Sequence, residues 1–112
     1  MESIPLLPGT LDLLVLETLR WGAQHGYGIA VAIQARSGEA LRVDPGSLYP
    51  ALHRLERQKL VAARWELSEN RQRVRVYRLS AAGRRRLDQE RARWQRMSAA
   101  VAGVLRRPAE EQ

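Results

Sequence analysis

The side chains best suited to binding chemistry lie in the stretch from Asp44 to Leu60, which reads DPGSLYPALHRLERQKL. Its leucines Leu48, Leu52 and Leu55 recur at the spacing of one helical face, which predicts a helix packed on a core. The opposite face carries no carboxylate and consists of Pro50, His53, Arg54 and Arg57. Guanidinium groups on such a helix suit the phosphates and base-edge acceptors of a nucleic-acid groove. The alternative is a solvated amphipathic helix that contacts no partner.

A second group of arginines follows, where the hydrophobic period changes from that of a helix to that of a strand. Alternate residues of segment 61–67 are apolar, which predicts a half-buried strand. Turn-forming residues at 68–71 lead into a second strand, so we expect a β-hairpin with Trp65 and Tyr77 pointing into the core. The residues Arg71, Arg73 and Arg75 cluster near its tip. They either contact a polyanion or, as strand-edge charges, only discourage aggregation.

The overall charge also favours a polyanionic partner. The 112 residues include 19 lysines and arginines against 12 acidic residues, which gives a net charge of +7 and a pI near 11.2. Nucleic acid is the first candidate partner, and an anionic membrane surface is the second. No apolar stretch approaches the roughly 20 residues needed to cross a bilayer, and the N-terminus lacks the pattern of a signal peptide. We therefore expect a soluble, cytoplasmic protein.

No set of residues has the spacing of a catalytic or metal site. The two histidines, His25 and His53, are not in a metal-binding spacing, no serine lies in a GxSxG motif, and cysteine is absent. The Gly26-Tyr27-Gly28 segment lacks the preceding strand and the Lys-Ser/Thr pair of a phosphate-binding loop, so we interpret it as a turn. We predict that the protein is not an enzyme and uses no cofactor or metal ion.

Two further helices precede the basic helix and must position it. Thr10 is a suitable N-cap for a helix that runs to about Trp21, and a second helix is expected to end near Ser37. Three short helices followed by a basic hairpin have the order of a winged helix-turn-helix, with the basic helix as recognition helix and the hairpin as wing. The predicted fold class is α+β, mainly α, and this domain spans residues 1–79.

A C-terminal dimerisation helix is predicted for residues 80–107, with Ser80 as its N-cap and a frayed tail at 108–112. It carries an apolar stripe in which residues recur every seven positions, and the first helix is apolar almost all the way round. A two-fold dimer would cover both surfaces, whereas the alternative is an intramolecular fold-back. The residues expected at the dimer interface are Leu11, Leu14, Leu87, Trp94, Met97 and Val101.

Four blocks of this sequence resemble the PadR family of bacterial transcriptional regulators. They are Gly26-Tyr27-Gly28-Ile29, GSLYPALHRLE at 46–56, Trp65-Glu66 and RVRVYRLSAAG at 73–83. The resemblance covers about residues 7–100, and the single terminal helix resembles that of the short PadR subfamily. It implies a homodimeric winged-helix protein, usually a repressor, that binds a near-palindromic double-stranded DNA operator and is often released by a small molecule.

The resemblance and the two arginine groups together suggest one set of DNA-facing residues. They are Ser47, Tyr49, Pro50, His53, Arg54, Arg57, Arg71, Arg73 and Arg75. Short PadR proteins that sense flat hydrophobic compounds use their dimer interface, which implies a small aromatic effector beside Trp94; the alternative is that this indole only fills the dimer core.

Two other functions are weighed against the DNA-binding regulator: an RNA-binding basic protein and a protein–protein adaptor, since a winged-helix fold alone excludes neither. We expect no exposed aromatic residue among the arginines, which argues against RNA binding. The basic outer face of the third helix argues against an adaptor.

Overall fold

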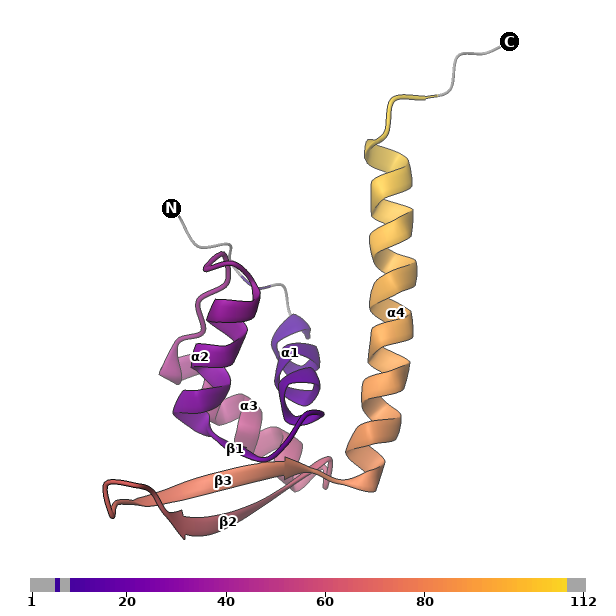
Figure 1. The fold of residues 1–112 in the computed structure, drawn as a ribbon. Coiled ribbons are helices and arrows are strands. Elements are labelled where there is room, and N and C mark those ends of the chain that lie inside the picture. Colours follow the sequence, from indigo (N-terminus) through magenta and orange to yellow (C-terminus); the bar gives the residue numbers. More distant parts are fainter. Residues whose placement is uncertain (1–5, 7–8, 109–112) are drawn as a thin grey trace.

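The computed structural model of this protein describes residue 6 and residues 9–108. In chain order its elements are α1 (Thr10–Leu19), β1 (Gln24–His25), α2 (Gly26–Arg36), α3 (Pro45–Arg57), β2 (Val61–Leu67), β3 (Arg73–Leu79) and α4 (Ala81–Leu105). The fold is α+β and mainly helical, as predicted, with the three helices and the hairpin of a winged helix-turn-helix (Figure 1). Apart from Pro108, the predicted frayed tail lies outside the described residues, as do residues 1–5, 7 and 8.

The three strands form one antiparallel sheet in the order β1-β3-β2. β2 and β3 pair along their whole length, with Trp65 opposite Arg75 and Ala63 opposite Tyr77. β1 was not predicted, because its two residues are too few to show a hydrophobic period. It pairs with the end of β3 nearest the core and closes the sheet beside α2.

The predicted starts of α1 and α2 are wrong. Thr10 is the first residue of α1 and not its N-cap, which is Gly9 in a left-handed conformation with φ of 85°. Gly26-Tyr27-Gly28 is not a separate turn, because these residues begin α2. The Nδ1 atom of His25 accepts a hydrogen bond from the Gly28 N–H at 3.0 Å and so caps this helix. A histidine cap is outside the usual Ser, Thr, Asp and Asn set, so the start was not recognised.

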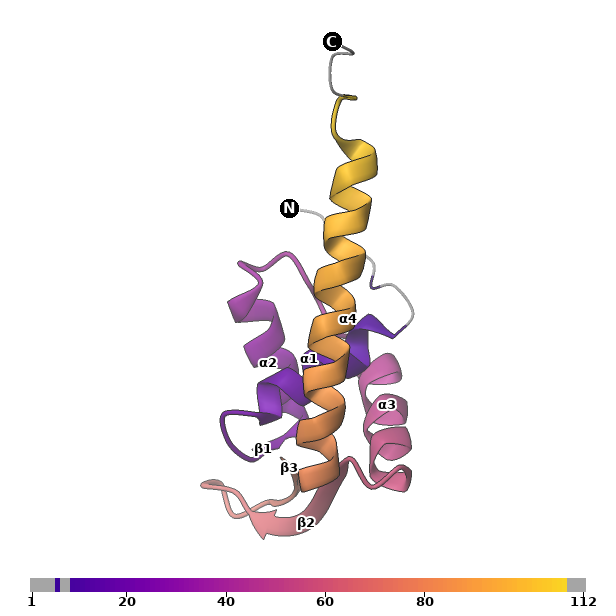
Figure 2. The same cartoon turned by 90° about the vertical axis from the view of Figure 1, so that its right-hand side faces the viewer.

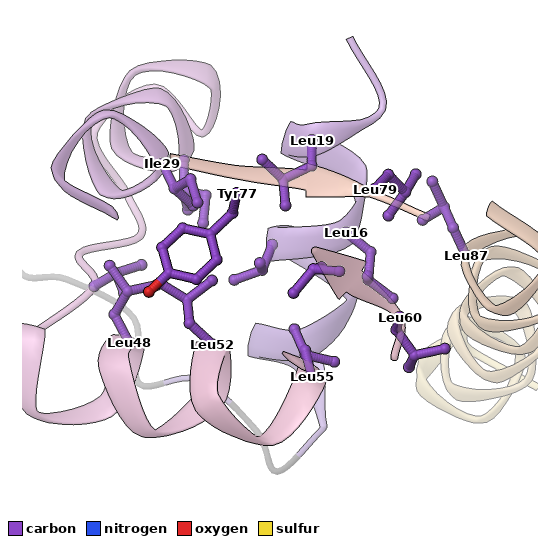
Figure 3. Close-up of a cluster of buried hydrophobic side chains, with 14 residues drawn as sticks. Leu16, Leu19, Ile29, Leu48, Leu52, Leu55, Leu60, Tyr77, Leu79 and Leu87 are labelled. Atoms are coloured by element: carbon purple, nitrogen blue, oxygen red, sulfur yellow. The ribbon is translucent and has the colours of Figure 1, made fainter. Parts of the chain in front are cut away.

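A single hydrophobic core joins the helices to the sheet (Figure 3). The leucines of α3 that were predicted to be buried, Leu48, Leu52 and Leu55, are at most 1% exposed. They pack in one cluster with residues of α1, α2, β3 and α4, which include Leu16, Leu19, Ile29, Tyr77, Leu79 and Leu87. Burial of this leucine face fixes which side of α3 is presented to solvent.

The β2–β3 hairpin extends past this core, which corrects the prediction for Trp65. Strand alternation places Trp65 on the same face of the sheet as Tyr77, as expected. Toward the tip, however, the hairpin lies beyond the helices (Figure 1), so Trp65 is 54% exposed whereas Tyr77 is 3% exposed. The predicted alternation is correct, and the predicted burial fails because the hairpin is longer than the core.

α4 begins after the predicted N-cap, Ser80, whose Oγ accepts the N–H of Gly83 at 2.9 Å. It ends at Leu105, two residues before the predicted end. Leu87 is 2% exposed within this one chain, so it is a core residue and not the exposed interface residue that we predicted. Farther along, α4 projects away from the other elements (Figure 2). No helix in the described part of the chain is both long and apolar enough to span a membrane.

Candidate nucleic-acid interface

The outer face of α3 presents the predicted contact residues to solvent. Asp44 is the N-cap and Pro45 occupies the first helical position, where a missing N–H costs no helical hydrogen bond. All the predicted contact residues of this helix are exposed, namely Ser47, Tyr49, Pro50, His53, Arg54 and Arg57. Tyr49 is also packed on one side, because a Cβ atom at Gly26 would lie only 2.7 Å from its ring. The Tyr49 ring therefore seats α3 against the start of α2.

Arg54 is held by a carboxylate of α1, which no local sequence pattern predicts. Its Nη2 atom lies 2.5 Å from Oδ1 of Asp12, and both side chains are partly exposed. The two residues are 42 positions apart in the chain, so only the packing of α1 on α3 reveals the pair. The ion pair neutralises one of the predicted DNA-contacting cations and ties α1 to the outer face of α3.

Arg75 connects the hairpin to α3. Its Nη2 atom lies 2.7 Å from Oε2 of Glu56, near the C-terminal end of α3, and about a third of each side chain is exposed. Burial raises the pKa of the nearby Tyr77 phenol above its ordinary value, an effect that Arg75 opposes and Glu56 reinforces. Arg75 therefore lies against α3 rather than free at the hairpin tip, and its ion pair links the hairpin to α3.

Trp65 lies among the wing arginines. The Cζ atom of Arg73 is 4.8 Å from the centroid of the indole, and that of Arg75 is 5.5 Å away. Both distances are within the range of a cation–π interaction. The prediction that no exposed aromatic residue accompanies these arginines is therefore wrong, and it no longer argues against RNA.

Three of the predicted contact arginines are available to a polyanion. Within the part of the chain that the structure describes, Arg57, Arg71 and Arg73 have no carboxylate oxygen within 4.0 Å of their guanidinium nitrogens. Arg57 ends α3, Arg71 occupies the hairpin turn with φ of 62°, and Arg73 begins β3. The three arginines thus run from the end of α3 to the start of β3.

A groove of about 300 Å³ lies between the start of α1 and the middle of α4. Three residues of the predicted dimer and effector interface line it, and each is between 43% and 54% exposed. The residues that line the groove are Gly9, Thr10, Leu13, Glu90, Arg93, Trp94, Met97 and Val101. Its apolar floor could hold a flat aromatic molecule or a side chain of a second copy.

The α1 side of this groove differs from the prediction. Leu13 lines it, whereas Leu11 and Leu14, which we expected at the interface, are half-buried against the core. α4 is also fastened to α1 of the same chain, because Nη1 of Arg91 lies 2.7 Å from Oε1 of Glu17. The first half of α4 therefore folds back on its own chain, and the second half remains uncovered.

A family comparison establishes the class of protein that carries this interface. The model of the transcriptional regulator PadR-like family matches residues 15–89, from α1 to the early turns of α4. This chain belongs to the PadR-like family. The matched part contains the recognition helix and the wing of this PadR-like chain, and the predicted family is confirmed.

Individual relatives agree with this assignment. The transcriptional regulator Rv3488 of Mycobacterium tuberculosis is 40% identical over 79% of this chain and 81% of its own length. An uncharacterized 37.1 kDa protein in transposon TN4556 of Streptomyces fradiae is 43% identical over 80% of this chain, but the match spans only 24% of that protein. A PadR family transcriptional regulator from Eggerthella lenta is similar in structure, with a TM-score of 0.74 and 32% identity over 87% of this chain and 82% of that chain.

These relatives confirm the predicted role in transcription regulation and the prediction that the chain is not an enzyme. Among the described residues, no group of three or more His, Cys, Asp or Glu side chains is placed to hold a metal ion.

Proposed function

We propose that this PadR-like regulator binds a near-palindromic duplex operator as a homodimer and represses transcription. The observation that carries the proposal is the exposed outer face of α3, which ends in Arg57 and is followed by a hairpin with Arg71 and Arg73. None of these three arginines has a carboxylate partner among the described residues. A helix and a basic hairpin in this order match the way winged helices place one helix in the major groove and the wing on the backbone. The net charge of +7 favours association with DNA phosphates.

The residues of the interface have different roles in this proposal. Arg57 and His53 contact base edges, and Arg54 joins them when DNA displaces Asp12. Arg71 and Arg73, with Ser47 at the start of α3, contact phosphates and set the register of the protein on the duplex. Tyr49 and Pro50 limit how closely α3 approaches the base pairs, since the Tyr49 ring is already wedged against Gly26.

Homodimerisation accounts for the uncovered second half of α4. Val101, Val104 and Leu105 are exposed there. A second copy related by a two-fold axis would bury this stripe and present two α3 helices to two half-sites of one operator. Apolar stripes of this kind are otherwise uncommon on the surface of a monomer.

A small aromatic effector fits the groove beside Trp94. The indole offers an apolar face for offset stacking, and the flexible Met97 can adapt the wall to different ligands. Because the groove adjoins the stripe that we assign to the dimer, a bound compound would alter how two protomers pack and thereby release the operator. The alternative is that a side chain of the second copy fills the groove and Trp94 only packs.

The specific observation in favour of RNA is the exposed Trp65 beside Arg73, because single-stranded RNA is commonly bound by stacking on aromatic side chains. A DNA-binding regulator and an RNA-binding protein differ in the nucleic acid that they prefer. Selection of bound fragments from a random duplex library, with a structured-RNA competitor present, therefore tests the proposal. We expect a shared motif with two related half-sites spaced by about one helical turn.

Two variants control this selection. Arg57→Ala should abolish enrichment of the motif, whereas Arg96→Ala, which removes the same charge from the exposed surface of α4, should enrich the motif of the wild type. Transcription in vitro from a promoter that contains the selected operator should then fall when the protein is added. The proposed function would be contradicted if no duplex motif is enriched. It would also be contradicted if the RNA competitor displaces all duplex DNA from the protein.

A further inference from the structure

The indole of Trp65 occupies an unusual place for so large an apolar group. It is 54% exposed and is not part of the hydrophobic core cluster. It is nevertheless ordered by the sheet register, which sets it opposite Arg75 and one diagonal step from Arg73 on the same face of the hairpin. Both guanidinium groups lie over its ring, at 4.8 and 5.5 Å from the centroid.

The two arginines differ in what else holds them. Arg75 is anchored on its other side by Glu56, so Trp65, Arg75 and Glu56 form a continuous link from the hairpin to α3. For Arg73, no carboxylate partner exists among the described residues, and the indole is the contact that the structure shows for its guanidinium. An arginine side chain has many rotamers, and ordering it at an interface costs free energy at the moment of binding.

We propose that Trp65 is a positioning residue of the wing, which orders Arg73, and through Arg75 the whole hairpin, before the wing meets the DNA backbone. The proposal rests on the proposed DNA-binding function and adds a residue that acts through the arginines. The partner groups are the phosphates that Arg73 neutralises. In this proposal the indole acts through the two guanidinium groups that lie over its ring and makes no contact with DNA of its own.

Removal of a positioning residue differs in a measurable way from removal of a charge. In Trp65→Leu the arginines keep their charge, so the number of phosphates neutralised and the slope of log affinity against log salt stay the same. The affinity itself falls, roughly tenfold, because the side chains must now be ordered during binding. In Arg73→Ala the affinity falls and the salt slope also becomes shallower by about 1.

Trp21 offers a matched control. It is also exposed and also carries an arginine, Arg20, with Cζ 5.3 Å from the ring centroid, but it lies outside the wing. Trp21→Leu should leave both the affinity and the salt slope unchanged. Trp65→Tyr, which retains an aromatic face, should fall between the wild type and Trp65→Leu, and it serves as the test variant if the leucine variant unfolds.

A double-mutant cycle and one DNA-free measurement decide the proposal. Trp65→Leu should have almost no further effect on affinity when Arg73 and Arg75 are both replaced by glutamine, whereas a full effect in that background would overturn it. In the free protein, side-chain NMR relaxation of the Arg73 Nε–H group should report greater mobility in Trp65→Leu than in the wild type, and equal mobility would also overturn it. If the wild type binds no duplex, the proposed function fails, while the relaxation measurement still shows whether Trp65 orders Arg73.

Discussion

Arg54 in α3 and Asp12 in α1 form an ion pair of 2.5 Å on the surface that we propose meets DNA. If Arg54 contacts DNA as proposed, the carboxylate of Asp12 occupies the place that a phosphate or a guanine edge would take in the complex. Exposed ion pairs of this kind contribute about 1 kcal/mol or less, so DNA can displace Asp12 at small cost. The pair also holds Arg54 in place while the protein is free.

Asp12→Asn should therefore strengthen binding to the operator, by about threefold to tenfold, because it frees Arg54 and removes a negative charge that faces the DNA. Titration of a fluorescent operator by anisotropy measures the change. Asp88→Asn is the matched control, since it removes the same charge from an exposed position of α4. If Asp12→Asn instead weakens binding while Asp88→Asn does not, Asp12 acts by holding Arg54 in its binding orientation.

Much of this fold could be predicted from the sequence because its signals are local. The leucine spacing of α3 reflects which face of the helix meets the core, and it agrees with the structure. The alternation of β2 correctly predicts a strand, but its apolar face is buried only at the start of the strand, at Val61. The exposure of Trp65 could not be predicted in the same way. It depends on how far the hairpin extends beyond helices that are distant in the sequence.

The same distinction applies to the candidate site. The exposed residues of α3 follow from its buried face, and the structure presents all of them to solvent. The sequence does not show which arginines are paired with a carboxylate. Tertiary packing brings Asp12 to Arg54 and Glu56 to Arg75. Leu87 was assigned to a dimer interface for a related reason: the heptad spacing shows an apolar stripe but not where the stripe leaves the core.

Gly83→Ala should destabilise the protein by about 2–4 kcal/mol. A Cβ atom at this position would lie 2.0 Å from the backbone carbonyl oxygen of Leu60, and a backbone group cannot rotate away as a side chain can. Urea unfolding followed by circular dichroism measures the loss. Gly46→Ala is the control, because a Cβ there would meet nothing within 4 Å in α3, and it should be neutral or stabilising by up to about 1 kcal/mol. Equal effects of the two substitutions would contradict the described contact between α4 and Leu60.

Charges placed on the uncovered stripe of α4 should separate the proposed dimer. Val101→Asp combined with Val104→Asp is expected to give a monomer, because two carboxylates would have to be buried without partners. Light scattering at micromolar concentration measures the mass. Ala99→Asp, on the opposite side of the same helix, should leave the dimer intact. A wild-type chain that is already monomeric under these conditions would refute the homodimer.

Planar aromatic compounds should quench the emission of Trp94 if the groove between α1 and α4 is an effector site. A Trp21→Tyr, Trp65→Tyr variant leaves Trp94 as the only indole, since the chain has three tryptophans. Saturable quenching that also releases the operator is the expected result. Trp94→Ala should abolish the response to the compound but not DNA binding. If no compound quenches and Trp94→Ala abolishes dimerisation, Trp94 is a packing residue only.

The most direct test of DNA binding compares two duplexes across a range of salt concentrations. Anisotropy titrations with the selected operator and with a shuffled duplex of the same length report affinity and salt dependence together. We predict tighter binding to the operator by roughly a thousandfold or more. If each protomer of a dimer neutralises about four phosphates, log affinity should fall against log salt with a slope of about −7. Equal affinity for both duplexes, or association that does not change with salt, would contradict sequence-specific binding of DNA by α3 and the wing.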